Sequence, residues 1–258
     1  MRRQSGSATQ GPRREDPEPD TTGRHPKGGQ RRRWIGPSEL DGNSTIGSVV
    51  QRRETQAPAN WEYYDRRVAQ GVPGISNAVA YWSGLGVETS ADDISAEAAQ
   101  VEAALRSLPP ATFVEVGAGP GTFTNVLPGW GVALDQSAAA LRTLLEGNPS
   151  VPVLRADARH LPVPDRAVER VFATHIYGLL DAATAAAVIS EARRVAHQVV
   201  VLDAGRPHGV PAEHWQQRTL PDGSEWRIFR RHFTPDVLAE ELGGSVLFAG
   251  RFYVLIAA

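Results

Sequence analysis

A glycine loop and a following aspartate give this chain the residue types that hold a nucleotide cofactor. Gly117, Gly119 and Gly121 are spaced as G-x-G-x-G, and glycine lets the backbone turn tightly and approach a ligand with no Cβ in the way. Asp135 follows at the end of the next apolar segment. A carboxylate at that place can accept hydrogen bonds from both ribose hydroxyls of an adenosine whose remainder lies over the loop. These residues therefore predict a site for a cofactor that contains adenosine.

A parallel sheet would bring these residues together. Residues 113–117 are a short apolar run rich in β-branched residues, which is typical of a buried parallel strand, and residues 122–127 resemble a short helix after the loop. Strand-like and helix-like segments then alternate, which favours a doubly wound sheet. Further strands are expected at 131–135, 151–155, 170–174 and 198–203, with helices at 138–146 and 181–196.

Both ends of this α/β region carry their own signals. Before the first strand, Ser95 is placed to cap a helix over residues 96–108. Near the C-terminus, a helix over residues 235–242 has proline at its first position and glycine beyond its end. The last two expected strands, 245–249 and 252–256, are joined by only two residues, which predicts an antiparallel pair.

The spacing of the glycines separates two kinds of cofactor. The dinucleotide fingerprint G-x-G-x-x-G would place its third glycine at position 122, where this chain has Thr122. The G-x-G-x-G present here, preceded by Glu115, resembles the first motif of the class I S-adenosylmethionine-dependent methyltransferases. The resemblance covers residues 95–258. It implies an α/β fold with a doubly wound, mostly parallel seven-stranded sheet and an antiparallel C-terminal strand pair.

The resemblance also implies which residues hold the cofactor, S-adenosyl-L-methionine. Asp135 matches the family's ribose-binding acid, and Asp157 matches the acid that takes the adenine amino group, beside the backbone N–H of Ala158. One departure is that Val168 and Glu169 stand where the family has Phe-Asp before the fourth strand. The expected cofactor-binding residues are Glu115, Gly117, Ala118, Gly119, Gly121, Asp135, Gln136, Asp157, Ala158 and Thr174.

Residues 174–178 follow the fourth strand and are expected to face the reacting methyl group. Ligands of an open α/β sheet bind outside the carboxyl ends of its strands. His175 has a pKa range suited to a general base, and Tyr177 can orient an acceptor or contact a sulfonium through its ring. We name both as candidate catalytic residues. The alternative for His175 is a ring that lines the cofactor pocket or packs as a hydrogen-bonded side chain.

A segment rich in aromatic and cationic residues, 208–231, is expected above the sheet. As a substrate lid, it would stack Trp215 or Trp226 on a planar acceptor and use Arg218 to bind an acidic group. The alternative is an edge hairpin whose arginines are solvated and whose tryptophans pack on the sheet. An amphipathic helix expected at residues 61–68 is a second candidate lid.

Charge and composition divide the chain in two. Residues 1–60 carry eleven Lys and Arg against seven Asp and Glu, whereas residues 61–258 carry sixteen against twenty-two. Residues 1–58 show neither a helical nor a strand period, which predicts a disordered basic tail before a methyltransferase domain, with its N-terminal helical extension, at 59–258. The acidic body would repel a nucleic-acid backbone, which argues against a DNA or RNA substrate.

Other absences narrow the chemistry. The chain has no cysteine, which excludes disulfides and every mechanism with a thiolate nucleophile. No spaced set of His, Asp and Glu suggests a metal site, so we expect none. No apolar run approaches the roughly 20 residues of a membrane span, and the N-terminus lacks the apolar core of a signal peptide. A cytoplasmic protein that does not contact the membrane is the expectation.

The leading hypothesis is a methyltransferase that acts on an oxygen, nitrogen or carbon atom of a small-molecule acceptor. One alternative is a regulatory protein of the same fold that binds the cofactor without turnover. A second is an NAD-dependent oxidoreductase, which predicts that nicotinamide dinucleotide, and not S-adenosylmethionine, raises the melting temperature. The acceptor, the atom methylated and the oligomeric state stay open.

Overall fold

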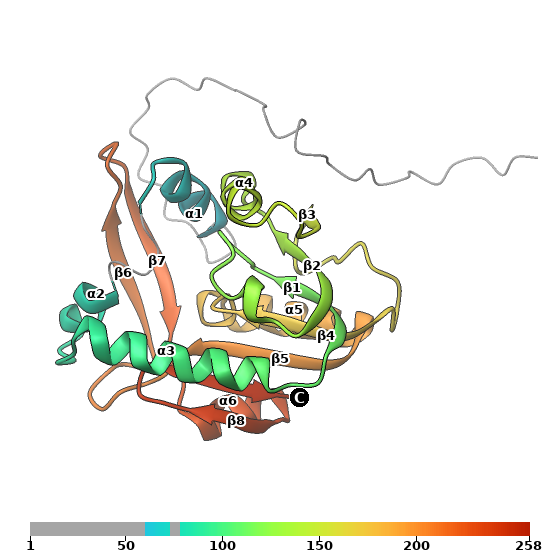
Figure 1. Ribbon diagram of the computed structural model, residues 1–258. Helices are drawn as coiled ribbons and strands as arrows, with labels where there is room; N and C mark the ends of the chain where they lie inside the picture. Colours follow the sequence, from blue (N-terminus) through green and yellow to red (C-terminus); the bar gives the residue numbers. More distant parts are fainter. Residues whose placement is uncertain (1–59, 73–77) are drawn as a thin grey trace, which may run out of the picture. The chain divides into compact units, whose positions relative to one another are not determined.

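The structure, a computed structural model, describes residues 60–72 and 78–258 (Figure 1). The basic tail expected at residues 1–58 lies outside the described residues. The described part contains a seven-stranded sheet with the order β3-β2-β1-β4-β5-β9-β8. Strands β1 to β5 are parallel, β9 is antiparallel to β5, and β8 is antiparallel to β9, which confirms the predicted fold. The strands are β1 (Ala111–Val116), β2 (Gly129–Asp135), β3 (Val153–Arg155), β4 (Val168–Thr174), β5 (Ala196–Ala204), β8 (Ser245–Ala249) and β9 (Tyr253–Ala257).

The strand order changes direction between β1 and β4. From β1 the chain moves outwards through β2 to β3, and it then returns to place β4 on the other side of β1. The connections that leave β1 and β4 therefore diverge, which opens a crevice at the carboxyl edge of the sheet. The glycine loop follows β1 and His175 follows β4 at this edge.

The helices begin close to where the sequence predicts, with one exception. Ser137 and Asp181 cap α4 and α5, which begin at Ala138 and Ala182, at or next to the predicted starts. The expected cap of α3 at Ser95 is wrong, because the helix begins after Ser90, whose side chain forms a capping box with Asp93. The helices are α1 (Asn60–Ala69), α2 (Ala78–Gly84), α3 (Ala91–Arg106), α4 (Ala138–Gly147), α5 (Ala182–Val195) and α6 (Pro235–Leu242), with short 3-10 turns η4 (Thr124–Val126) and η5 (Tyr177–Leu179).

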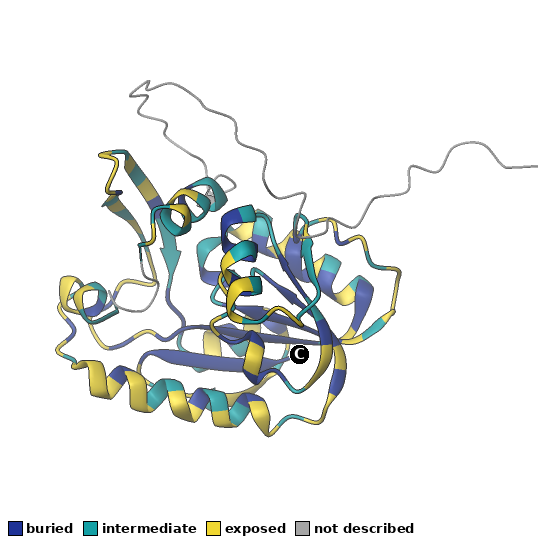
Figure 2. Cartoon of the chain, turned by 45° about the horizontal axis from the view of Figure 1, so that its top comes forward, coloured by how far each residue is buried: buried dark blue, intermediate teal, exposed yellow. Residues whose placement is uncertain are grey.

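Alternate residues of the central strands pack against opposite layers of helices. In β4, Val171 and Ala173 belong to the core under α5 and α6, whereas Phe172 packs with Val101 and Leu105 of α3. This alternation is the consequence of the two-residue period of a strand that is buried on both faces. Figure 2 shows the same pattern, with buried residues along the central strands and exposed residues on the outer surfaces of the helices. No helix among the described residues combines the length and apolar character that crossing a membrane requires.

A second, two-stranded sheet completes the described part. Strands β6 (Glu213–Thr219) and β7 (Glu225–Arg231) pair as an antiparallel hairpin, which stands up from the large sheet beside α1 (Figure 1). A hairpin is one of the two alternatives that the sequence predicts for residues 208–231. Together with α1 and α2, it covers the carboxyl edge of the sheet.

Candidate cofactor and acceptor site

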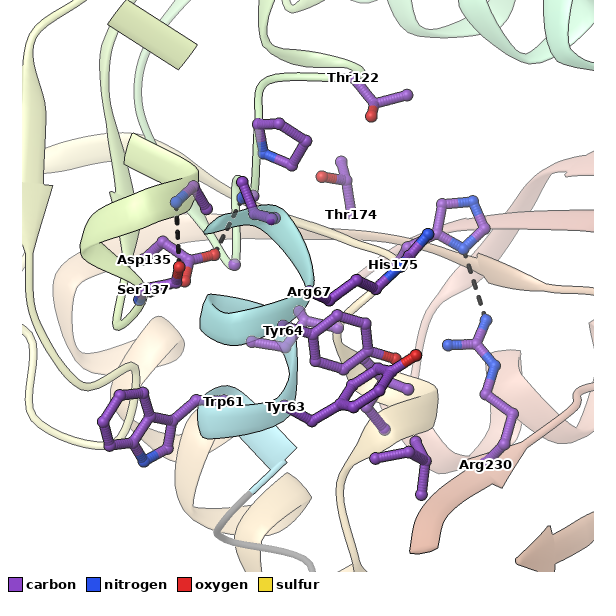
Figure 3. A pocket seen from close by; sticks show the side chains of 18 of the residues that line it. Trp61, Tyr63, Tyr64, Arg67, Thr122, Asp135, Ser137, Thr174, His175 and Arg230 are labelled. Carbon is purple, nitrogen blue, oxygen red and sulfur yellow. Dashed lines mark hydrogen bonds between the residues drawn. The ribbon is translucent and has the colours of Figure 1, made fainter. Parts of the chain in front are cut away.

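A cavity of about 1110 Å³ lies at the carboxyl edge of the sheet. Its walls come from the glycine loop, the ends of the parallel strands, α1, α2 and the β6–β7 hairpin. In Figure 3, Asp135 lies at one end and Arg230 at the other, with Tyr64 of α1 between them. We call these the loop end (Gly119, Asp135) and the hairpin end (Arg218, Arg230). A site for one drug-sized ligand usually has roughly 300–1,000 Å³, so this cavity has room for a cofactor and a second small molecule.

Most of the predicted site residues line this cavity. Those that do so are Gly117, Ala118, Gly119, Asp135, Gln136, Asp157, Ala158, Thr174 and His175. Glu115, Gly121 and Tyr177 are not part of its lining.

The glycine loop has a backbone with positive φ at its three glycines, a conformation that other residues adopt only with strain. Gly117 has φ +68°, and a Cβ on it would come within 2.7 Å of Ile176. Gly119 has φ +56°, and a Cβ there would meet nothing within 4 Å. Left-handed backbone at both positions favours glycine, and the open space beside Gly119 leaves the backbone accessible to a ligand. Gly121 shares the left-handed conformation, but its α-carbon faces Leu144 of α4 and the packed interior.

Asp135 has the hydrogen-bonding capacity that a ribose requires. Its carboxylate accepts one hydrogen bond from the Gly119 N–H at 2.9 Å and one from the Ser137 N–H at 2.8 Å. A carboxylate offers about four acceptor positions, so about two remain for a pair of adjacent hydroxyls. Burial raises the pKa of Asp135, and the backbone hydrogen bonds oppose that shift. These residues therefore fit an adenosine at the loop end.

Asp157 lines the cavity but is already engaged. The Arg159 side chain binds both carboxylate oxygens, with Nη2 at 2.6 Å from Oδ2, and the Arg159 N–H donates to Oδ1 at 2.9 Å. Partial burial raises the pKa of Asp157, but the hydrogen bonds from Arg159 together lower it by more than burial raises it. The net shift of the pKa is downward. An adenine amino group that binds this carboxylate would share it with Arg159 or displace the arginine.

Glu115 supports the loop from beneath instead of lining the cavity. It is fully buried, and its two oxygens accept hydrogen bonds from the hydroxyls of Thr124 at 2.7 Å and Thr174 at 2.8 Å. Burial raises the pKa of Glu115 to about 6, against the effect of these two hydrogen bonds. The carboxylate thus ties the start of η4 to the end of β4, which positions Thr174 in the cavity wall.

His175 lies where the prediction placed it, in an unusual backbone conformation. Its φ is +59°, a left-handed value that costs energy for residues other than glycine and that concentrates at functional sites. The ring stacks on Phe123 and meets Tyr253 edge-on. Burial lowers the pKa of His175 to about 4, with Asp203 and Arg230 acting in opposite directions, so the ring is neutral at neutral pH. The third of the side chain that is exposed faces the cavity.

The hydrogen-bonding partner of His175 reduces its suitability as a base. Nδ1 lies 3.5 Å from Nη2 of Arg230, and a guanidinium can only donate (Figure 3). In a neutral ring the proton is therefore on Nε2, where it can be donated to a ligand. A base with a pKa of about 4 also has little affinity for a proton at neutral pH.

The structure does not support the expected catalytic role of Tyr177. Its side chain is buried in the core beneath α5 and α6, and its hydroxyl donates to Glu241 of α6 at 2.5 Å. Burial, and then the hydrogen bond to Glu241, raise its pKa. The sequence correctly places Tyr177 after β4, but η5 turns the side chain away from the cavity and into the helix layer.

Helix α1 covers the loop end and is fixed to it by Asp65. The Asp65 carboxylate accepts hydrogen bonds from the Ser137 hydroxyl at 2.8 Å and the Ala139 N–H at 3.1 Å, both at the start of α4. A carboxylate at a helix N-terminus is favoured by the helix dipole. This contact holds Tyr64 and Arg67 of α1 over the cavity, as the prediction of a lid at residues 61–68 requires.

One face of the hairpin supplies most of the hairpin residues that line the cavity. His214, Gln216 and Arg218 of β6 stand opposite Arg230, Ile228 and Trp226 of β7, so these six residues share a face. All except Trp226 line the cavity, and Trp226 packs against Tyr63 instead. Trp215 lies on the opposite face and is exposed. The predicted stacking of an acceptor on Trp215 or Trp226 is therefore not supported, whereas Arg218 has the expected position.

The site contains an ion pair that sequence reasoning missed. Asp203, at the end of β5, is fully buried and accepts hydrogen bonds from Nη2 of Arg230 at 2.9 Å and from the N–H groups of Gly178 and Ala204, both at 2.7 Å. The pair fixes the hairpin to the sheet beneath His175. An acidic residue at a predicted strand end was a usable signal, but nothing in the sequence identified Arg230 as its partner.

Two further histidines lie at the hairpin end: His214 lines the cavity, and the His232 ring stacks on the His214 ring. Nδ1 of His232 lies 3.1 Å from the Pro211 carbonyl, which only accepts, so Nε2 accepts from the Tyr81 hydroxyl at 2.6 Å. Burial and then Arg230 lower the pKa of His232 to about 4, and burial followed by Arg230 and Arg218 lowers that of His214. Positive charge at this end therefore comes from the arginines. Within the described ranges, no group of three or more His, Asp or Glu side chains is arranged to hold a metal ion.

Comparisons with known proteins agree with the fold. Residues 114–200 match a family model described as a methyltransferase domain. The structure is similar to that of DhpI in complex with SAH, at 22% sequence identity over 78% of this chain and 95% of that chain, with a TM-score of 0.57. It is similarly close to the DhpI-SAM-HEP complex, at 21% identity over 81% of this chain and 100% of the other, with a TM-score of 0.57. A search of curated proteins found no match.

Proposed function

We propose that this chain, which carries a class I S-adenosylmethionine-dependent methyltransferase domain, transfers a methyl group to an oxygen, nitrogen or carbon atom of a small-molecule acceptor. The observation that carries the proposal is a cavity with room for two ligands, in which a ribose-competent carboxylate, Asp135, occupies one end. The cover formed by α1 and the hairpin favours a small acceptor over a polymer.

The loop end would hold the cofactor through three features. Asp135 would accept the two ribose hydroxyls, and Asp157 would accept the adenine amino group if Arg159 moves aside. Gly119 would let the backbone lie against the ligand, because no side chain occupies the space beside it. Glu115 would act indirectly, through the position of Thr174.

When bound, S-adenosylmethionine supplies an electrophilic methyl group on a sulfonium, from which transfer is an in-line displacement. The protein contributes mainly orientation and exclusion of water to such a step. The rings of Phe123 and Tyr253 fix His175 at the junction of the two ends, where its Nε2–H can orient an acceptor. If a His175→Ala variant retains full turnover, His175 has no part in the reaction.

Calorimetry with S-adenosylhomocysteine tests the cofactor assignment. We expect saturable binding to the wild-type chain and a loss of roughly tenfold or more for Asp135→Ala, since two hydrogen bonds to a charged group are removed. Asp165→Ala is the matched control, because Asp165 is 77% exposed and outside the cavity lining. Absence of binding to the wild-type chain, or equal losses for the two variants, contradicts the proposal.

A further inference from the structure

We infer that the acceptor carries an anionic group, a carboxylate or a phosphorus oxyanion, and that Arg218 at the hairpin end binds that group. The inference deepens the proposed function and rests on it. It specifies the charge of the acceptor and the protein residue that binds the charged group.

Arg218 is a cation held in the cavity wall by neutral partners. Its Nε and Nη2 donate to Oε1 of Gln216 at 3.0 and 2.6 Å, and its Nη1 donates to the Tyr63 hydroxyl at 3.4 Å. The guanidinium also lies 5.9 Å from the Tyr63 ring and 5.8 Å from the Tyr81 ring. No carboxylate among the described residues forms an ion pair with it. A partly buried charge of this kind is stabilised when a ligand supplies the opposite charge.

The free part of the guanidinium suits an oxyanion. Arginine has five N–H donors, and the neutral partners of Arg218 use three of them. The remaining donors are on Nη1 and Nη2, the pair that binds carboxylate or phosphate oxygens side by side. Gln216 holds the planar group at its other edge, so little side-chain entropy remains to be lost on binding.

The distribution of charge along the cavity supports the same conclusion. The carboxylates among the described lining residues are Asp135 and Asp157, both at the loop end. Arg230 adds a second guanidinium to the hairpin end and lies close enough to Tyr81 to interact with its hydroxyl. Although Asp203 neutralises Arg230 from behind, Asp203 is fully buried and does not line the cavity. An acceptor therefore meets guanidinium groups and phenol rings, with no carboxylate at that end to repel an anion.

The experiment titrates matched anionic and neutral probes into the chain saturated with S-adenosylhomocysteine. Benzoate and phenylphosphonate represent the two sources of negative charge, and benzamide is the neutral counterpart of benzoate. Heat of binding and the shift in melting temperature are recorded at constant ionic strength, for the wild-type chain and for Arg218→Gln, Arg218→Lys and Arg227→Gln. Arg227 is the matched control, because it is on the same hairpin but is exposed and outside the cavity lining.

We expect at least one anion to bind, and to bind about tenfold or more tightly than benzamide. Loss of a charge-assisted pair costs about 1.5–3 kcal/mol, so Arg218→Gln should weaken the binding of that anion by about 10- to 100-fold. Arg218→Lys should give an intermediate loss, and Arg227→Gln none. Preference for benzoate or for phenylphosphonate identifies the source of the charge.

Three outcomes overturn the inference. The first is no saturable binding of either anion to the cofactor-loaded chain, and the second is equal binding of benzoate and benzamide. The third is an Arg218→Gln variant whose affinity for S-adenosylhomocysteine falls as much as its affinity for the anion, which would assign Arg218 to the cofactor site instead. Failure of the wild-type chain to bind S-adenosylhomocysteine at all is a separate result, and it contradicts the proposed function.

Discussion

Replacing Asp203 by Asn should detach the hairpin from the sheet and destabilise the fold. The carboxylate of Asp203 is fully buried and serves three donors: Arg230 at 2.9 Å, and the N–H groups of Gly178 and Ala204 at 2.7 Å. An asparagine at this position can direct its carbonyl oxygen at only one side of the site. Its NH₂ group would then face at least one donor, and Arg230, whose side chain is only 12% exposed, would lose its carboxylate.

The size of the effect follows from this burial. Breaking a buried ion pair by removing one partner costs about 3–5 kcal/mol, because the other charge stays buried without compensation. That is a large part of the roughly 5–15 kcal/mol by which most domains are stable. Asp165→Asn provides the comparison, since Asp165 is 77% exposed and Arg194 keeps Glu191 as a second partner. An exposed pair of this kind contributes less than about 1 kcal/mol.

Urea denaturation followed by circular dichroism measures both variants at the same pH. We expect Asp203→Asn to lose about 3 kcal/mol or more of unfolding free energy, and Asp165→Asn to lose less than about 1. Adding Arg230→Met to Asp203→Asn should recover part of the loss, because the uncompensated charge is then removed. Equal losses for Asp203→Asn and Asp165→Asn would refute the reasoning.

Three further predictions concern the buried titratable groups. Glu115→Gln should cost about 1–3 kcal/mol in urea denaturation, because a hydroxyl such as that of Thr124 then loses its acceptor; an unchanged stability would contradict the role of Glu115 beneath the loop. Tyr177→Phe should leave turnover unchanged and reduce stability by about 1 kcal/mol, so a large loss of turnover alone would restore Tyr177 to the site. The unfolding free energy should decrease as the pH falls from about 6.5 to about 4, since His175 and His232 take up protons more readily in the unfolded chain than at their native pKa of about 4. Glu115, with its native pKa of about 6, acts in the opposite direction between about pH 4.5 and 6 but with a smaller shift, and a His232→Gln variant with an unaltered pH dependence would exclude His232 as a source.

The fold followed from local patterns in the sequence. Buried parallel strands and the helices between them have distinct hydrophobic periods, so the sequence predicts the order of these elements. The two-residue link at Gly250 and Arg251 predicts the antiparallel strand pair at the C-terminal end of the sheet. The start of α3 differs from the prediction at Ser95 because Ser90 and Asp93 form a capping box that begins the helix five residues earlier. Short elements such as α2 carry too little periodicity to be recognised by this means.

The site was predictable only where function depends on position along a strand. Asp135 and His175 were found because the carboxyl ends of neighbouring parallel strands meet at one edge. The ion pair between Asp203 and Arg230 depends on how the hairpin packs against the large sheet, and no local sequence pattern predicts that packing. The Tyr177 side chain lies in the core because Tyr177 begins the 3-10 turn η5, a turn that the sequence pattern does not predict.

A crystal structure of the chain with S-adenosylhomocysteine would test the central claim most directly. The account predicts that the ribose hydroxyls lie within hydrogen-bonding distance of the Asp135 carboxylate, which is about 3 Å. It also predicts that the sulfur faces His175 and the hairpin end, with Arg218 still accessible beyond it. A cofactor bound away from Asp135, or one whose amino-acid portion occupies Arg218, would contradict the account.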